Sequence, residues 1–264
     1  MIGDLVTGAG YVPRGLGRLT EPGLRGYVWL PLLINVVVFI ALFWLGGAAF
    51  QDLLDWMLPS AEAGADAGWW ATVADWAVTA LRWILWPLFA VAAALVAFYT
   101  FTITANLIGA PFNEFLARRV ELLATDGRAP AETDEGGLAA QAIGSVADEL
   151  RKLVYFAAVA IPLLVLFFVP VVQVAAPFLW AAFGAWAAAL EYMDYPLGNH
   201  GIRFRDQRAQ LRRRRMLIFG FGAGVVVMTL IPVVNLVAMP SAVIGATMLW
   251  VEQLGGRPAS GASG

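Results

Sequence analysis

Residues 26–51 read GYVWLPLLINVVVFIALFWLGGAAFQ, and this stretch between Arg25 and Asp52 contains no charged side chain. A helix needs about 20 apolar residues to cross a hydrocarbon core about 30 Å thick. The stretch is long enough to do so, and its one proline, Pro31, lies near the start, where a helix tolerates it. We therefore predict a membrane-spanning helix over about 26–50.

The rest of the chain repeats this pattern. Hydrophobic residues make up 60% of the sequence and charged residues 14%, against about 45–50% and about 25% in soluble domains. The excess apolar surface must therefore face lipid. A second uncharged tract between Arg82 and Glu114 predicts another spanning helix over about 83–112.

Two later tracts, 153–190 and 216–251, are also uncharged but carry internal prolines. Proline removes a backbone hydrogen bond and breaks or kinks a helix. Each broken tract gives two arms of about 16–18 residues, or about 25 Å each, which is short for a full crossing. We favour a helical hairpin that enters and leaves on one face of the membrane; two short crossings remain the alternative. The prolines are Pro162, Pro170 and Pro177 in the first tract, and Pro232 and Pro240 in the second.

The expected fold is thus an all-α integral membrane domain over 1–252, with two long spanning helices and two partly inserted hairpins. Helical extensions in the cytoplasm are expected on either side of a polar loop at 125–137. The Gly/Ser-rich residues 253–264 are expected to be a disordered tail.

Charge asymmetry predicts the orientation of the chain. The segment 52–82 carries one arginine and five acids, whereas 114–152 and 191–215 carry five and seven basic residues. Because cytoplasmic loops are enriched in basic residues, the termini and both later loops are expected in the cytoplasm.

Several kinds of chemistry are excluded or disfavoured. The chain has no cysteine, which rules out disulfides and thiolate metal sites. Its only lysine, Lys152, does not follow a glycine-rich run, so it is not a phosphate-loop lysine. The only histidine, His200, has no histidine or cysteine partner for a metal, and no serine has a nucleophile-elbow context. We expect neither an enzyme nor a cofactor, metal or nucleic-acid partner.

The segment from Glu21 to Gly26 is the clearest candidate site. Gly23 lets the backbone approach a ligand closely. The free N–H groups at the start of a helix favour an anion, and Arg25 adds a full positive charge. The alternative, which we prefer on the residues alone, is that Arg25 anchors the helix to lipid phosphates.

Other polar residues have two possible roles each. Amides within the apolar tracts, such as Asn35, Asn106 and Asn113, either join helices or line a passage for an anion. A gate or a cytoplasmic rim is possible for Glu114, Arg118 and Arg119. The segment 191–205 combines acids, an amide, His200 and arginines, although a lone histidine is more often structural.

At these positions the sequence resembles the CysZ family of bacterial inner-membrane sulfate permeases. The motifs that carry the resemblance extend over most of the chain. They are Pro22-Gly23-Leu24-Arg25, residues 105–113, 191–196 and 198–201, Leu230-Ile231-Pro232 with Asn235, Met239-Pro240, and Gly245-Ala246-Thr247.

The resemblance implies a multi-pass homo-oligomer in the inner membrane that takes up sulfate, or related oxyanions such as sulfite, for cysteine biosynthesis. It places sulfate binding on Gly23, Leu24 and Arg25. Many members carry a second arginine where this chain has Gly26. Transport is either passive or proton-coupled, and a membrane scaffold or regulator that transports nothing is the alternative function. The polar residues implied to line the route are Asn35, Asn106, Asn113, Glu114, Arg118, Glu191, Asn199 and His200.

Overall fold

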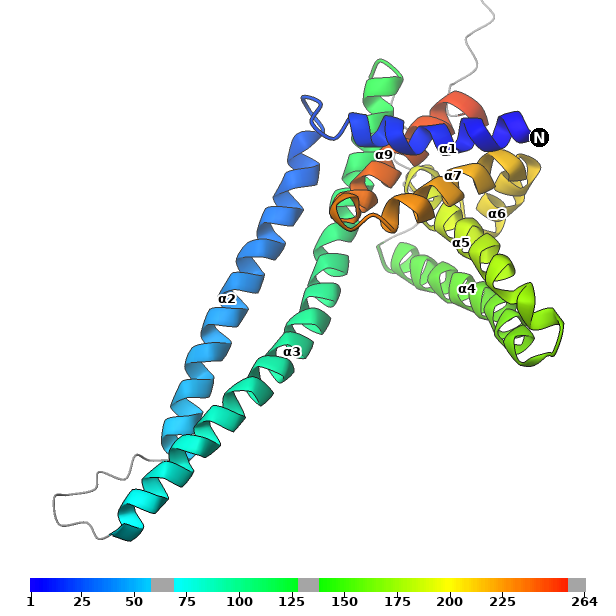
Figure 1. Ribbon diagram of the computed structural model, residues 1–264. Helices are drawn as coiled ribbons and strands as arrows, with labels where there is room; N and C mark the ends of the chain where they lie inside the picture. Colours follow the sequence, from blue (N-terminus) through cyan, green and yellow to red (C-terminus); the bar gives the residue numbers. More distant parts are fainter. Residues whose placement is uncertain (58–68, 128–137, 256–264) are drawn as a thin grey trace, which may run out of the picture. The chain divides into compact units, whose positions relative to one another are not determined.

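The computed structural model describes residues 1–57, 69–127 and 138–255 (Figure 1). Every regular element in these ranges is a helix, which confirms the prediction of an all-α fold. The elements are α1 (Ile2–Gly17), α2 (Arg25–Met57), α3 (Trp69–Ala124), α4 (Leu138–Val165), η1 (Leu166–Phe168), η2 (Val172–Val174), α5 (Ala176–Gly198), α6 (Phe204–Arg213), α7 (Arg215–Thr229), α8 (Pro232–Asn235), α9 (Ala238–Leu249) and η3 (Trp250–Leu254).

Three helices are long and apolar enough to cross a membrane, judged by length and composition: Arg25–Trp56, Thr72–Val96 and Ala147–Phe168. The first includes the stretch that we predicted to span. The second begins earlier than the predicted residue 83, because α3 already starts at Trp69. The third is the first arm of a tract that we expected to form a hairpin, and its 22 residues match the length of a complete crossing.

The chain divides into two compact units, which we describe separately. The central unit comprises residues 29–110 and the terminal unit comprises residues 1–28 and 111–264. In the central unit, Phe50 of α2 stacks on Phe89 of α3 with ring centroids 3.8 Å apart, and Arg82 pairs with Asp55 at 2.9 Å. Most large apolar side chains of this unit are exposed, which suits a lipid environment better than water.

The terminal unit is built on close contacts between helix backbones. Helix α1 packs on α7 and α9, and α5 packs on the same two helices (Figure 1). Glycines make these contacts possible because they have no Cβ atom. An added Cβ on Gly8 of α1 would lie 1.9 Å from the carbonyl oxygen of Leu217, and one on Gly222 of α7 would lie 1.8 Å from that of Ala185.

Sequence reasoning did not predict α1. Asp4 and Arg14 interrupt its apolar residues, and its glycines lower helix propensity. The helix is nevertheless fixed in the core by Tyr11 and Val12, which are 2% and 4% exposed. Tertiary packing therefore outweighs weak local propensity at the N-terminus.

Prolines end helices at some of the expected places. The chain turns between α4 and α5 at residues 166–175, which include Pro170, whereas α4 continues through Pro162. Pro177 lies in the first turn of α5, Pro232 begins α8, and Pro240 is the third residue of α9. Proline is tolerated in a first turn because its missing N–H group has no partner there.

The predicted cytoplasmic loop has the bounds that we expected, since α3 ends at Ala124 and α4 begins at Leu138. Residues 128–137 of this loop lie outside the described part of the chain. The last helix, η3, includes Gln253 and Leu254, two residues that we expected in the tail. The remaining tail residues, 256–264, also lie outside the described ranges.

Candidate functional site

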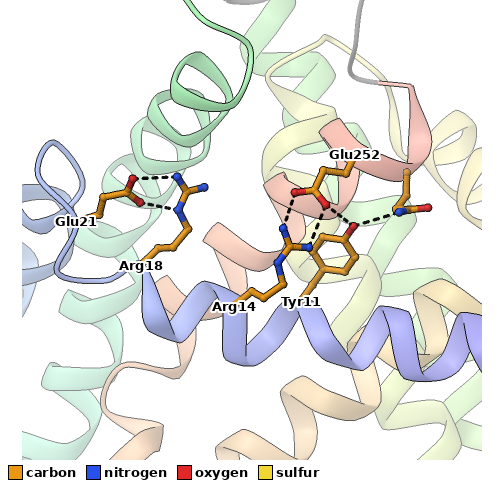
Figure 2. Close-up of polar contacts among 6 residues, drawn as sticks. Tyr11, Arg14, Arg18, Glu21 and Glu252 are labelled. Atoms are coloured by element: carbon orange, nitrogen blue, oxygen red, sulfur yellow. Dashed lines mark hydrogen bonds and ion pairs between the residues drawn. The ribbon is translucent and has the colours of Figure 1, made fainter.

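The turn between α1 and α2 is organised by Glu21. Its carboxylate accepts two parallel hydrogen bonds from the guanidinium of Arg18, at 2.5 and 2.9 Å (Figure 2). Its backbone carbonyl accepts from the N–H groups of Leu24 and Arg25, at 3.0 and 3.3 Å. The expectation that the N–H groups at this helix start are free is therefore wrong for these two residues.

Gly23 gives the turn its shape. Its φ angle is +94°, a conformation that residues with a side chain rarely adopt. The next residue, Leu24, is 0% exposed, so its side chain anchors the turn in the core and cannot touch an anion. Arg25 begins α2 with an exposed side chain. Of the three residues in the motif, Gly23 supplies the conformation and Arg25 supplies the charge.

Arg119 of α3 lies beside this turn. Its Nη2 and Nε atoms are 3.5 and 3.7 Å from the position that a Cβ atom on Gly23 would take. In the part of the chain that the structure describes, no carboxylate pairs with Arg25 or Arg119. The sequence placed Arg119 at a rim or gate, and no spacing pattern links it to Gly23. The structure thus brings a second guanidinium to the motif from a distant helix.

The segment 191–205 forms two polar clusters. In the first, the ammonium group of Lys152 pairs with Glu149, Glu191 and Asp194 at 3.0, 3.3 and 3.0 Å. Gln207 of α6 donates to Asp194 at 2.7 Å. The only lysine therefore joins α4, α5 and α6, and Glu191 serves as one of its partners.

The second cluster lies around the end of α5. The imidazole Nε2 of His200 is 2.7 Å from Glu121 Oε1 and 3.3 Å from the indole Nε1 of Trp250. Asn199 donates to the backbone carbonyl of Glu114 at 3.3 Å, and Asn113 forms a side-chain hydrogen bond with Tyr195. These contacts bring the C-terminal part of α3 together with the chain after α5.

Four of the candidate passage residues, Asn113, Glu114, Asn199 and His200, thus lie in one region of the terminal unit. Arg118 lies on α3 between Glu114 and Glu121 and has interaction partners of its own. The side chains of Asn35 and Asn106 lie outside the described residues. Glu121, which is 1% exposed, was not predicted. Its place in an ordinary amphipathic pattern gave no sign that it is buried.

Burial dominates the electrostatics of the tyrosines near this region. Burial raises the pKa of Tyr192 to about 12, and the neighbouring Tyr195 and Glu191 add to the effect. Burial also raises the pKa of Tyr195, assisted by Glu191 and opposed by the hydrogen bond with Asn113. Among the described residues, no group of three or more His, Asp or Glu side chains is arranged to hold a metal ion.

A third set of contacts joins the two ends of the terminal unit. Arg14 of α1 donates two hydrogen bonds to the carboxylate of Glu252, at 2.7 and 3.0 Å, and the Tyr11 hydroxyl donates to the same carboxylate at 2.7 Å (Figure 2). Burial and this hydrogen bond raise the pKa of Tyr11. The contacts hold α1 against η3, immediately before the turn that carries Gly23.

Comparison with known proteins was consistent along the chain. Residues 11–240 match the family model described as Sulfate transporter CysZ/Etoposide-induced protein 2.4. The chain is 41% identical over 255 residues to a protein named Sulfate transporter CysZ from Pseudomonas fluorescens, with 97% of each chain covered. A protein of the same name from Pseudomonas aeruginosa is 39% identical over 254 residues, covering 96% of this chain and 97% of the relative. One from Salmonella enteritidis is 39% identical over 247 residues, covering 93% and 92%. The chain belongs to the CysZ family of sulfate transporters.

Proposed function

We propose that this chain takes up sulfate across the inner membrane of a bacterium and supplies cysteine biosynthesis. Relatives of about 40% identity named Sulfate transporter CysZ support this proposal. The chain would cross the membrane with α2 and α3, insert the α4–α5 and α7–α9 segments as hairpins, and assemble as a homo-oligomer. Sulfite and other oxyanions of similar shape are further candidate substrates.

The observation that carries the proposal is the pair of exposed guanidinium groups at Gly23. Sulfate is a doubly charged tetrahedral oxyanion, and it is bound best by charge-assisted hydrogen bonds from fixed donors. Arg25 lies at the start of α2, where the helix dipole also favours an anion. Arg119 lies against Gly23 from α3. We propose that sulfate is held between these two side chains.

This arrangement also answers the departure at Gly26. A chain with arginines at two consecutive positions presents both guanidinium groups from the same turn. Here Arg119 supplies the second group from α3, so that the site keeps two positive charges for a dianion. The charge of Glu21 does not oppose sulfate strongly, because Arg18 binds its carboxylate.

Beyond the first site, we propose that neutral and paired polar groups line the route. Neutral amides can coordinate an anion without trapping it, as conduction requires. The candidates are Asn35, Asn106, Asn113, Glu114, Arg118, Asn199 and His200. Glu191 would take part only if its ion pair with Lys152 opened.

The membrane potential makes the energetics of uptake unfavourable. A dianion entering against 100 mV faces about 4.6 kcal/mol. Passive flow would therefore equilibrate with about 2,000-fold less sulfate inside than outside. Either metabolism removes sulfate as fast as it enters, or protons accompany it.

A membrane scaffold that transports nothing remains the rival function. Flux of radioactive sulfate into proteoliposomes separates the two. We expect flux above empty vesicles, and at least a ten-fold lower affinity for sulfate in the Arg25→Ala variant. The matched control is Arg213→Ala, which removes an exposed arginine at the end of α6.

Absence of flux through the wild-type chain, with the protein folded in the vesicles, would favour the scaffold. Equal affinity in Arg25→Ala and Arg213→Ala would remove Arg25 from the site, even if flux were present. A comparison with and without a pH gradient then distinguishes passive from proton-coupled transport.

A further inference from the structure

Glu121 is the most deeply buried carboxylate among the described residues, and it is only partly satisfied. Its side chain is 2% exposed. Oε1 lies 2.7 Å from His200 Nε2, but Oε2 is buried and receives no hydrogen bond from the residues that the structure describes. An ionised carboxylate in such a place is costly unless its charge is compensated. The contact with His200 is therefore the means by which Glu121 can be accommodated.

The hydrogens around His200 Nε2 permit only certain arrangements. The indole Nε1 of Trp250, 3.3 Å from Nε2, can only donate a hydrogen bond. If Nε2 carries a hydrogen, it donates to an ionised Glu121 and leaves the indole without an acceptor. If Nε2 has no hydrogen, it accepts from Trp250, and Glu121 must be protonated in order to donate. The proton can thus reside on Glu121 or on His200.

We propose that Glu121 and His200 together bind one proton, and that this proton site is linked to occupancy of the anion site at Gly23. With the proton bound, the pair has no net charge, either as two neutral groups or as imidazolium and carboxylate. When the proton leaves, one negative charge remains buried beside an unsatisfied oxygen. The two groups are so close that they titrate as a unit rather than separately.

Other charged groups on the surrounding elements are already engaged or lie on α3 itself. Arg118 and Arg119 precede Glu121 on α3, and Asp126 follows it. On η3, the carboxylate of Glu252 is bound by Arg14 of α1. After α5, Arg203 binds Asp148. The buried carboxylate therefore obtains compensation from His200 rather than from a direct ion pair with an arginine among the printed contacts of this region.

The linkage has a definite sign, and it rests on the proposed sulfate function. Arg119 and Glu121 are two residues apart on α3, so a dianion beside Arg119 raises the cost of a negative charge on the pair. Bound sulfate then favours the protonated, neutral pair. By reciprocity, a lower pH strengthens sulfate binding by the same factor. A proton bound on one side of the membrane and released with sulfate on the other would couple the two fluxes.

The chain offers a direct test, because His200 is its only histidine. Labelling histidine with ¹⁵N in the full-length chain in lipid nanodiscs gives ring signals from one residue. We expect the proton affinity of the ring in the wild type to be at least ten-fold higher than in Glu121→Gln. The matched control Glu149→Gln, which removes an exposed carboxylate of the same unit, should leave the titration unchanged. Equal titration in wild type and Glu121→Gln would overturn the proposal.

Two further arms keep the outcome decisive. If Glu121→Gln fails to fold, Trp250→Phe removes the indole donor while keeping an aromatic ring. We then expect the Nε2 signal to move toward that of a protonated nitrogen, and no change would contradict the shared proton. Addition of sulfate, but not chloride, should raise the proton affinity in wild type and not in Arg25→Ala. A proton site that persists without any effect of sulfate would overturn the linkage, whereas absent flux with an intact proton site would overturn only the proposed transport.

Discussion

The guanidinium of Arg119 lies against the backbone of Gly23, with Nη2 3.5 Å from the position that a Cβ atom would take. The two residues are far apart in the sequence, yet the first turn of α2 and the C-terminal part of α3 meet here. Gly23 has a positive φ angle and no side chain, so the face of the turn stays open beside the guanidinium. This relationship is the basis of the first prediction.

Replacing Arg119 with alanine should weaken sulfate binding without unfolding the chain. A hydrogen bond to a charged group contributes about 1.5–3 kcal/mol, so we expect an affinity about ten-fold to a hundred-fold lower. Arg119→Lys should recover part of the loss, because it keeps the charge but not the planar donors. The concentration dependence of sulfate flux measures the effect. If Arg119→Ala behaves like the exposed-site variant Arg213→Ala, the second guanidinium has no role in binding.

Two glycines of α1 should respond in opposite ways to alanine. Gly8→Ala places a Cβ 1.9 Å from the carbonyl oxygen of Leu217, so α1 and α7 must separate, at a cost of about 1–3 kcal/mol or more. Gly10 has no atom within 4 Å of the added Cβ, and Gly10→Ala should stabilise the helix by about 0.5–1 kcal/mol. Thermal unfolding in detergent measures both. Equal changes in Tm would mean that the close contact of α1 with α7 is not formed.

The sequence predicted those features that depend on local pattern. The uncharged tract after Arg25 predicted α2, and the polar residues after Ala124 predicted the loop between α3 and α4. The contacts that build the candidate site depend instead on tertiary packing. Neither Arg119 beside Gly23 nor Glu121 beside His200 follows from spacing, because each pair joins segments from different helices. Helix α1 escaped prediction for the same reason, since its stability comes from α7 and α9.

The carboxylate of Glu252 should hold α1 in place. In Glu252→Ala, Tyr11 and Arg14 lose an acceptor. Arg14 is largely exposed, and an exposed ion pair contributes about 0–1 kcal/mol, so most of the loss comes from the buried Tyr11 hydroxyl. We expect faster amide hydrogen exchange in α1 and a total loss of about 1–2 kcal/mol. Asp4→Ala, which removes only a long contact with Arg214 at 3.7 Å, is the control, and comparable exchange in the two variants would exclude Glu252 as the anchor of α1.

Tyr192 should make the chain sensitive to alkaline pH. Burial, with smaller contributions from Tyr195 and Glu191, raises its pKa to about 12 in the folded chain, against about 10 for an unfolded tyrosine. A group whose pKa is raised by folding contributes stability that is complete below about pH 10 and is lost as the pH approaches 12. Tyr192→Phe cannot ionise, so its Tm should decline less than that of the wild type over this range. Glu191→Gln should change the decline only slightly, because burial is the larger cause, and parallel curves for the wild type and Tyr192→Phe would show that Tyr192 is not the group responsible.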